Sequence, residues 1–355
     1  MVVLHATDPA TIFLSLSARC GALSVADIEQ LLYGDRSMMR HMAMRRTLYV
    51  GSERGVSVIE ASSSGDVAAK ERKALEKWLT MTGFDDPAGW LEHAFAETLE
   101  SLAVDGAATA RQMTRRVPRL ATRIVTGSGK FTAEVGATSK VLGLMAVEGV
   151  LARGRPTGSW TTRQYTWHRR TDWFPESNLD PDEASVELIR WWLERFGPGT
   201  VTDLKWWTGW TVAKTKRALA LIDVVEVELE RGETGFVLSA DVAAVDAPDP
   251  WVSLLPSLDP TPMGWKDREW YIGDHTPVLF DRNGNIGPTI WADGHIVGYW
   301  AQGGDARVRT ELFESLSKPH TRLLAAEVER VEAFVDGVQV KPSFPTPGQK
   351  ELATH

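Results

Sequence analysis

The chain has 355 residues, of which 43% are hydrophobic and 24% charged, and its formal net charge is -8. This composition is that of a soluble globular protein of two to four modules, and the acidic balance excludes a protein that coats nucleic acid by bulk charge. A single cysteine excludes an intrachain disulfide and a cysteine-based zinc site, so we expect no metal, no cofactor and a reducing, cytoplasmic setting. We expect neither a signal peptide nor a membrane partner, since no apolar run approaches the roughly 20 residues that span a bilayer.

The first predicted module covers residues 1–104. Asp8 followed by Pro9 is typical of a helix start, and Ser24 is a second N-cap candidate. We predict helices over 8–20, 24–32 and 35–42, a strand over 46–50, a break at 57–64, and helices over 67–81 and 90–102. Three helices followed by a strand is the order of a winged helix-turn-helix.

The second module, residues 105–178, carries a basic block. Between Arg111 and Arg170 there are twelve basic and two acidic residues, a balance of +10, which leaves -18 for the rest. We predict helices over 109–117 and 139–148, and strands over 150–153 and 159–167. A local basic block in an acidic chain indicates a DNA contact, although a solvated face is the common alternative.

The third module, residues 179–247, repeats the order of helix, turn, helix and hairpin. A helix over 183–196 should end at Gly197-Pro198-Gly199, and Thr202 and Thr211 should cap two short helices separated by a turn. The predicted elements are helices over 203–207 and 212–221 and strands over 224–229 and 235–238. Short helix, turn, second helix and hairpin wing is again the winged-helix order.

The last part, residues 248–340, is predicted to be a small β-barrel or sandwich with a closing helix. Hairpin turns are indicated at Asn283-Gly284 and Asp293-Gly294. The predicted elements are strands over 251–255, 269–272, 278–280, 289–291 and 296–300 and a helix over 321–334. Residues 341–355 are predicted to form a loose tail.

Short motifs occur in one order over nearly the whole chain, from residue 4 to about 334. They are Leu4-His5-Ala6-Thr7-Asp8-Pro9, Ala18-Arg19, Met44-Arg45-Arg46-Thr47-Leu48-Tyr49, Arg155-Pro156-Thr157-Gly158-Ser159-Trp160, Phe196-Gly197-Pro198, Trp207-Thr208-Gly209, Leu254-Leu255-Pro256, Asp259-Pro260, Asp293-Gly294 and Val297-Gly298. Together they resemble the AlkZ-like winged-helix DNA glycosylases of bacteria. The resemblance implies an α+β fold of three tandem winged-helix domains, the first of them N-terminally short, followed by a small β-barrel. It also implies monofunctional removal of alkylated purines from DNA.

The resemblance places the chemistry on two polar residues that flank an apolar one, usually Gln-x-Gln or Gln-x-Asp. His5-Ala6-Thr7 occupies that position here, so His5 and Thr7 are the candidate catalytic residues. An alkylated purine is a good leaving group, so the enzyme must mainly hold a water against C1′ and stabilise the sugar cation. Neutral His5 can accept a proton from water, and the Thr7 hydroxyl can donate and accept. The alternative is that His5 is only a structural residue near a helix start.

The candidate DNA-binding residues are basic side chains on the predicted helices and wings. They are Arg45, Arg46, Lys140, Arg155, Arg163, Arg169, Arg170, Lys214, Lys216 and Arg217. Together they predict a salt-sensitive affinity for double-stranded DNA. Trp206, Trp207 and Trp210 flank the third turn, where we expect core packing rather than wedging into a base stack.

The favoured function is a DNA glycosylase that acts as a monomer on damaged duplex DNA. The alternatives are a non-catalytic damage sensor and a transcription regulator. A regulator should dimerise on a palindromic site, and the sequence offers no long apolar dimer seam.

Overall fold

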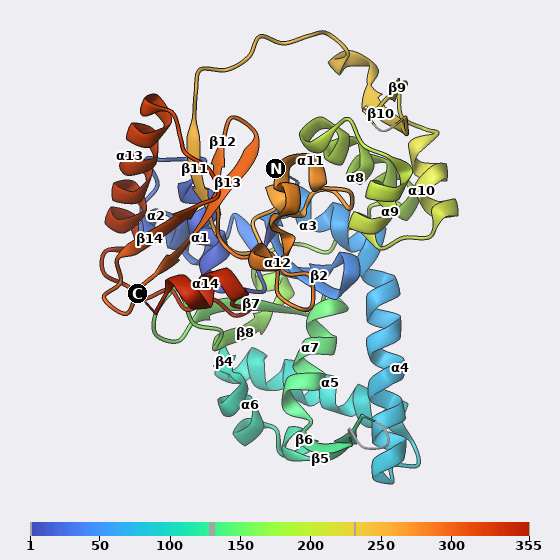
Figure 1. The fold of residues 1–355 in the computed structure, drawn as a ribbon. Helices are drawn as coiled ribbons and strands as arrows, with labels where there is room; N and C mark the ends of the chain where they lie inside the picture. Colours follow the sequence, from blue (N-terminus) through green and yellow to red (C-terminus); the bar gives the residue numbers. More distant parts are fainter. Residues whose placement is uncertain (1, 128–131, 231, 355) are drawn as a thin grey trace. The chain divides into compact units, whose positions relative to one another are not determined.

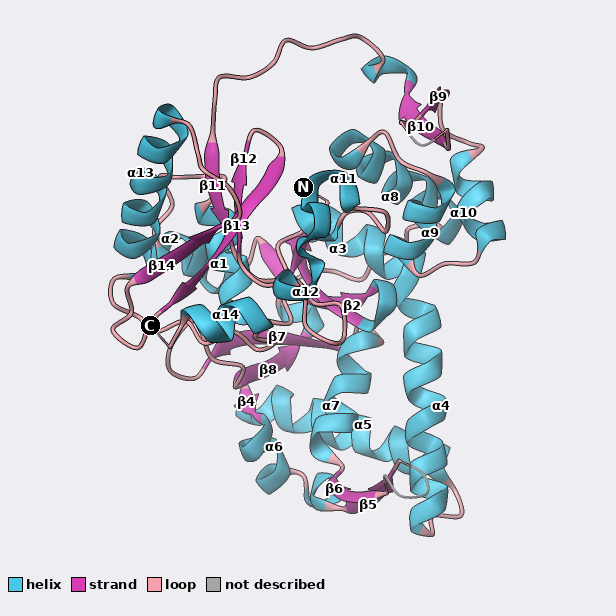
Figure 2. Ribbon diagram, in the orientation of Figure 1, coloured by secondary structure: helices cyan, strands magenta, loops and turns pink. Residues whose placement is uncertain are grey.

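The computed structural model describes residues 2–127, 132–230 and 232–354. The chain forms two compact units, one built from residues 31–188 and the other from residues 1–30 with 189–355 (Figure 1). Helices and strands are mixed in both, which confirms the expected combination of helix and sheet (Figure 2). Within the described residues, no helix is both long and apolar enough to cross a membrane.

The unit of residues 31–188 holds most of the long helices. Its elements are β2 (Met38–Ala43), β3 (Thr47–Ser52), α3 (Glu53–Ile59), α4 (Gly65–Thr82), α5 (Pro87–Asp105), β4 (Ala108–Thr109), α6 (Ala110–Arg116), β5 (Arg123–Thr126), β6 (Ala133–Gly136), α7 (Thr138–Val147), β7 (Leu151–Pro156), β8 (Tyr165–Arg169) and the first half of α8 (Pro181–Phe196). β2 pairs with β3 and β5 with β6, both antiparallel, while β8 lies between β4 and β7.

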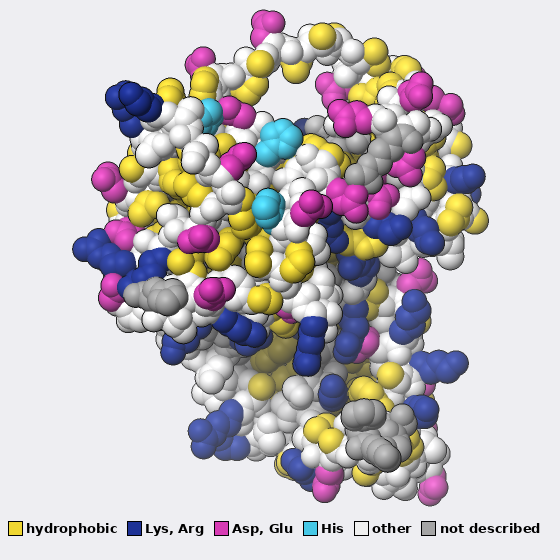
Figure 3. All heavy atoms as spheres, in the orientation of Figure 1, with side chains coloured by type: hydrophobic (Ala, Val, Ile, Leu, Met, Phe, Trp, Pro, Cys, Tyr) yellow, Lys and Arg dark blue, Asp and Glu magenta, His cyan; other side chains and the backbone are white. Residues whose placement is uncertain are grey.

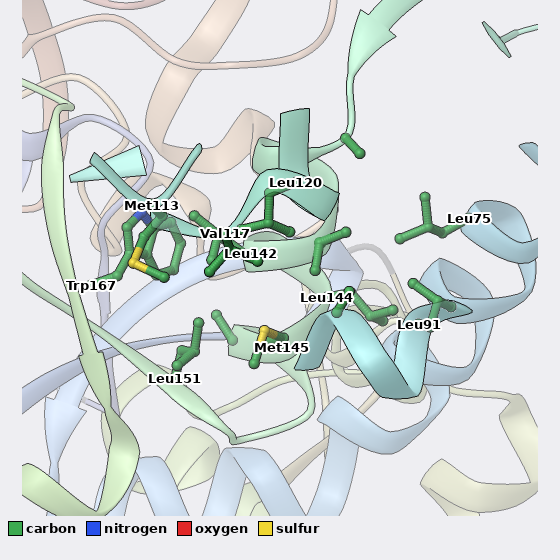
Figure 4. Close-up of a cluster of buried hydrophobic side chains, with 14 of the residues drawn as sticks. Leu75, Leu91, Met113, Val117, Leu120, Leu142, Leu144, Met145, Leu151 and Trp167 are labelled. Atoms are coloured by element: carbon green, nitrogen blue, oxygen red, sulfur yellow. The ribbon is translucent and has the colours of Figure 1, made fainter. Parts of the chain in front are cut away.

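A hydrophobic core joins α4, α5, α6 and α7 in this unit (Figure 4). Leu75 of α4 and Leu91 of α5 are buried at its one end, and Met113 of α6 lies with Trp167 of β8 at the other. Burial of each such side chain contributes about 1.5–3 kcal/mol to stability. The core therefore holds α7 and the β4-β8-β7 sheet in fixed positions, and these elements carry several candidate DNA-binding residues.

The other unit combines the N-terminal segment with the C-terminal half. Its elements are β1 (Leu4–His5), α1 (Pro9–Ser17), α2 (Val25–Glu29), the second half of α8, α9 (Val201–Thr208), α10 (Val212–Leu219), β9 (Val224–Glu228), β10 (Thr234–Leu238), β11 (Val252–Leu255), α11 (Glu269–Ile272), α12 (Thr276–Leu279), β12 (Thr289–Ala292), β13 (His295–Gln302), β14 (Val308–Leu312), α13 (Lys318–Val335) and α14 (Pro347–Leu352). An antiparallel sheet has the order β11-β12-β13-β14, and α13 packs against β11.

Several helix starts lie where the N-cap chemistry predicted them. The Asp8 carboxylate accepts from the amide of Ala10, and Ser24 forms a capping box with Asp27. Thr211 caps α10 as expected, whereas α9 is capped by Thr200 and not by Thr202. Thr200 is the N-cap because its hydroxyl accepts from the backbone amide of Asp203, while the Asp203 carboxylate accepts from the backbone amide of Thr200.

The helix predicted over 35–42 is wrong, because Met38–Ala43 is strand β2. It pairs with β3 from Met38 opposite Ser52 to Ala43 opposite Thr47. A six-residue helix forms few hydrogen bonds, and these hardly offset the conformational entropy lost in ordering its first turn. The hairpin instead bonds every second residue of β2 to a partner strand. The three methionines fit either period, so their spacing could not decide.

Two further segments of the same unit, residues 57–64 and 159–167, also differ from expectation. Residues 57–64 do not interrupt the chain's helices: α3 continues into a π-helical turn, Glu60–Ser64, that leads directly into α4. The serines are accommodated because they are buried with bonded hydroxyls, as when Ser64 donates to the Met42 carbonyl at 2.9 Å. The strand predicted over 159–167 starts only at Tyr165, since the amide of Thr162 bonds the Ser159 carbonyl in a turn.

The C-terminal part departs most from prediction. The segment expected as a strand at 269–272 is the short helix α11, and most of the segment at 278–280 belongs to α12, with only Phe280 extended in a bridge to Ile286. Among the described residues the four-stranded sheet is open, with β11 and β14 at its edges, so no closed barrel forms. The expected loose tail instead contains α14, capped by the buried Thr346. Short apolar runs suit a strand or a buried helical turn equally, and only packing distinguishes them.

Candidate functional site

The His5–Ala6–Thr7 segment is an extended stretch immediately before α1. Ala6 is fully buried, whereas His5 and Thr7 on either side of it are half-buried. The backbone N–H of Thr7 donates to Nδ1 of His5 at 3.4 Å. This long bond holds the imidazole beside the threonine and gives the neutral ring a preference for carrying its proton on Nε2.

Asp8 fixes the orientation of this segment. It is 3% exposed and caps α1 through Oδ1, which accepts from the Ala10 amide at 3.2 Å. Its other oxygen, Oδ2, accepts from the backbone amide of Ser343 at 2.8 Å. The C-terminal segment thus bonds the residue next to Thr7, a constraint that the sequence motif alone did not reveal.

The far end of α1 is held by a buried carboxylate. Asp259 is fully buried and accepts from Ser15 Oγ at 2.6 Å and from both terminal nitrogens of Arg19, at 2.7 and 2.9 Å. Its Oδ1 also accepts from the amide of Thr261. A carboxylate with this many donors is fully satisfied, so it locks α1 against the segment that precedes α11.

A small cavity of about 30 Å³ lies beside Asp8 and Thr11, bordered by Ser257, Trp300 and Gln349. One water needs roughly 10–15 Å³ of such space, so the cavity has room for one or two waters and none for a purine. The Ser257 hydroxyl and Gln349 Oε1 have no hydrogen-bond partner among the described residues, and a buried water would satisfy both. The cavity beside α1 therefore has the size of a water site and not of a base-binding pocket.

The third predicted module presents its basic residues on α10. α9 and α10 are separated by Gly209, whose φ of 72° is in the left-handed region that glycine tolerates. Lys216 and Arg217 are exposed on α10, and Lys214 Nζ lies 4.6 Å from the Trp210 ring centroid.

Two of the three tryptophans that flank this turn belong to the core, whereas Trp206 on α9 is half-buried. Trp207 and Trp210 are 7% and 6% exposed, which confirms core packing for these two side chains. They are therefore not placed to wedge into a base stack.

The other unit carries the remaining candidate cations in different environments. Arg155 is exposed on β7, Arg163 is exposed in the turn before β8, and Lys140 Nζ lies 5.1 Å from the Trp78 ring. Further Lys and Arg side chains project from the surface over α4 (Figure 3). Arg155 and Arg163 thus lie at the surface of this unit.

Arg45, Arg46, Arg169 and Arg170 are less free than the sequence suggested. Arg45 and Arg46 form the exposed turn between β2 and β3, and Arg46 Nε pairs with Glu71 at 2.6 Å. Arg169 Nη2 pairs with Asp172 Oδ1 at 2.8 Å.

Arg170 is 3% exposed, and its Nη2 bonds Glu60 Oε2 at 2.6 Å. The expectation that Arg170 faces DNA is not met, because Glu60 in the π-helical turn neutralises it inside the unit.

Sequence reasoning missed three charged or titratable residues of this unit. Arg40 and His41 on β2 are 2% and 1% exposed, and Arg153 lies on the neighbouring strand β7. Burial first, then the positive charges of Arg170 and Arg153, lower the pKa of His41 to about 3, so it is neutral at physiological pH. A strand predicted over 38–43 would have placed Arg40 on a buried face. Predicting that strand required knowing that it pairs with β3.

Comparison with known proteins gives one consistent result. A family model described as DNA glycosylase AlkZ-like matches residues 1–334. The chain belongs to the AlkZ-like DNA glycosylase family. This confirms the resemblance drawn from the short motifs, and it makes the chain a DNA glycosylase by family, in agreement with the favoured enzyme class.

Individual relatives agree with the AlkZ-like assignment. The interstrand DNA cross-link repair glycosylase of Streptomyces sahachiroi is 28% identical over 285 residues, which cover 75% of this chain and 71% of that protein. The solved structure of Streptomyces sahachiroi DNA glycosylase AlkZ matches with a TM-score of 0.71 and 19% identity, over 95% of this chain and 90% of that one. At that identity the structural match supports the fold alone.

Within the described residues, no group of three or more His, Cys, Asp and Glu side chains is arranged to hold a metal ion.

Proposed function

We propose that this chain is a DNA glycosylase that hydrolyses the N-glycosidic bond of alkylated purines in duplex DNA, using a water oriented by His5 and Thr7. The observation that carries the proposal is the geometry of the motif. Ala6 is fully buried and anchors the segment, His5 and Thr7 flank it half-buried, and Asp8 is held by two hydrogen bonds. Membership in the AlkZ-like family supports the reaction class.

The proposed reaction needs no proton on the departing base. The C1′–N bond breaks with its electron pair going to the cationic purine, which leaves neutral, and the sugar becomes cationic at C1′. The water oxygen then bonds to C1′ and its proton passes to solvent. Because His5 Nδ1 accepts from the Thr7 amide, the neutral ring carries its proton on Nε2, and in the proposed reaction this N–H donates to the water, in place of the proton acceptance expected from the sequence. The Thr7 hydroxyl accepts from the same water.

We propose that DNA is bound through winged-helix modules. α9, the turn at Gly209, α10 and the β9-β10 hairpin follow the order of such a module, with Lys216 and Arg217 exposed on the second helix. One protein molecule would bind one duplex and recognise the lesion rather than a palindromic sequence. The affinity for duplex DNA should then fall as the salt concentration rises, as expected for phosphate contacts.

The test is release of N7-methylguanine from duplex DNA under single-turnover conditions. His5→Ala and Thr7→Val should each slow release on the order of 10²-fold, as removal of a preorganised hydrogen-bonding group does. Thr7→Ser keeps the hydroxyl and should retain most of the rate, whereas Thr7→Val has nearly the same shape without it. Circular dichroism confirms that each variant is folded.

Absence of base release, with binding to the duplex preserved, would refute the enzymatic proposal. The chain would then be a DNA-binding protein without catalysis, such as a damage sensor. Release that is indifferent to both residues would place the chemistry elsewhere in the chain.

A further inference from the structure

A cluster of arginine and aromatic side chains lies inside the unit of residues 31–188. Arg40 on β2 is 2% exposed, and its Cζ lies 5.4 Å from the ring centroid of Tyr33 and 5.0 Å from that of Tyr165. Arg153 on β7 places its Cζ 4.8 Å from the Trp167 ring centroid. β2 and β7 are neighbours and the charge of Arg40 acts on Arg153, so the two guanidinium groups lie near each other, each beside aromatic rings.

These two arginines carry buried nitrogens that no described residue bonds. Nε and Nη2 of Arg40 and Nη1 of Arg153 are buried without a hydrogen-bond partner in the described part of the chain. Arg170 in the same unit differs in having a carboxylate partner: its Nη2 bonds Glu60 at 2.6 Å, although its Nε is also buried without a partner among the described residues. Leaving a buried charged donor unpaired carries a large desolvation cost, which a bound anion would offset.

Two neighbouring groups respond to the positive charge gathered here. After burial, the charges of Arg170 and Arg153 lower the pKa of His41, the residue next to Arg40 in the chain. Burial first, opposed by Tyr165 and reinforced by the charge of Arg40, lowers the pKa of Arg153 to about 10. Two like charges in one apolar setting repel each other, and a bound anion would relieve this repulsion.

We propose that Arg40 and Arg153 form a binding site for a phosphate group, with the exposed Arg155 as its outer member. Arg155 lies on the same strand as Arg153, and its Cζ is 4.9 Å from the Tyr33 ring that also faces Arg40. The planar guanidinium fork matches two oxygens of a phosphate, which makes phosphate the fitting class of ligand. Resting on the proposed function, the favoured source is the DNA backbone; free phosphate shares the same chemistry.

Access to this site passes the tyrosine rings. Tyr33 and Tyr165 are half-buried and lie over the Arg40 guanidinium, so a phosphate reaches it when these rings turn aside. The aromatic faces then border the bound phosphate group and exclude water from it, which strengthens each hydrogen bond to the anion.

The first experiment uses inorganic phosphate as the probe. Thermal unfolding of the full chain is followed in phosphate and in chloride at equal ionic strength. The wild-type protein should be stabilised by phosphate, and Arg40→Met and Arg153→Met should lose that response. Arg111→Met, at an exposed arginine on α6 of the same unit, is the matched control and should retain it.

The second experiment measures affinity for an undamaged duplex as a function of salt. Loss of one phosphate contact should lower the slope of log K against log salt by about 0.9 and weaken binding about tenfold. Arg40→Lys, which keeps the charge without the fork, covers the case in which Arg40→Met does not fold, and it should show an intermediate affinity.

The outcomes separate the possibilities. A lower slope in the Arg40 and Arg153 variants supports a DNA phosphate at this site. A phosphate-specific stabilisation of the wild type with unchanged slopes supports free phosphate as the ligand. The absence of both effects would overturn the proposal. If N7-methylguanine is not released but either effect is present, the phosphate site stands and the proposed hydrolysis fails.

Discussion

Acidification should destabilise the unit of residues 31–188 through one residue, His41. The imidazole is 1% exposed on β2, and its Nε2 lies 3.0 Å from the Ser64 hydroxyl. Burial first, then the charges of Arg170 and Arg153, lower its pKa to about 3 from an ordinary value of 6.5. The folded protein therefore leaves His41 neutral under conditions where the unfolded chain protonates it.

The direction of this pH effect on stability follows from the number of protons that the folded and unfolded states bind. Below about pH 6.5 the unfolded chain takes up a proton at His41 that the folded chain does not, so acid favours unfolding until the folded group also titrates, near pH 3. The contribution to stability is complete above pH 6.5 and is lost as the pH falls. At pH 5 the loss is about 2 kcal/mol relative to pH 7, at about 1.4 kcal/mol per pH unit. This value barely depends on the folded pKa, provided that it is well below 5.

The assay is urea unfolding of the wild type and of His41→Gln at pH 7 and pH 5. The glutamine amide can still bond the Ser64 hydroxyl but cannot titrate. The wild type should lose about 2 kcal/mol more than the variant between these two pH values, because other groups titrate equally in both. An equal loss in the two proteins would refute the assignment of a buried, neutral histidine.

Two further predictions concern stability. Asp259→Asn should lower the free energy of unfolding by about 2–3 kcal/mol in denaturant titrations, because it removes the buried carboxylate charge that pairs with Arg19. The control is Arg46→Met, which removes an exposed ion pair and should change the free energy of unfolding by less than about 1 kcal/mol. Similar losses in the two variants would contradict the role of burial. Removal of residues 341–355 should speed amide hydrogen exchange at the start of α1, because Asp8 loses the Ser343 amide; unchanged exchange there would show that this contact does not order the segment.

The sequence by itself determined the local signals of this protein. Helix starts at Asp8, Ser24 and Thr211 could be predicted because an N-cap depends only on one side chain and the next few amides. The motif order from residue 4 to about 334 was sufficient to indicate the family, which the family model over residues 1–334 confirms.

Only the tertiary structure decided the features that depend on distant partners. Met38–Ala43 is a strand because β3 pairs with it, and the C-terminal helix α14 is ordered because Thr346 and Gln349 are buried. The candidate catalytic residues could be predicted from a motif, but the bond to the adjacent Asp8 comes from Ser343, more than 330 residues away in sequence. Likewise, no local pattern distinguishes the buried Arg40 from the exposed Arg45. A side chain's environment is set by what packs against it, and that information is spread over the whole chain.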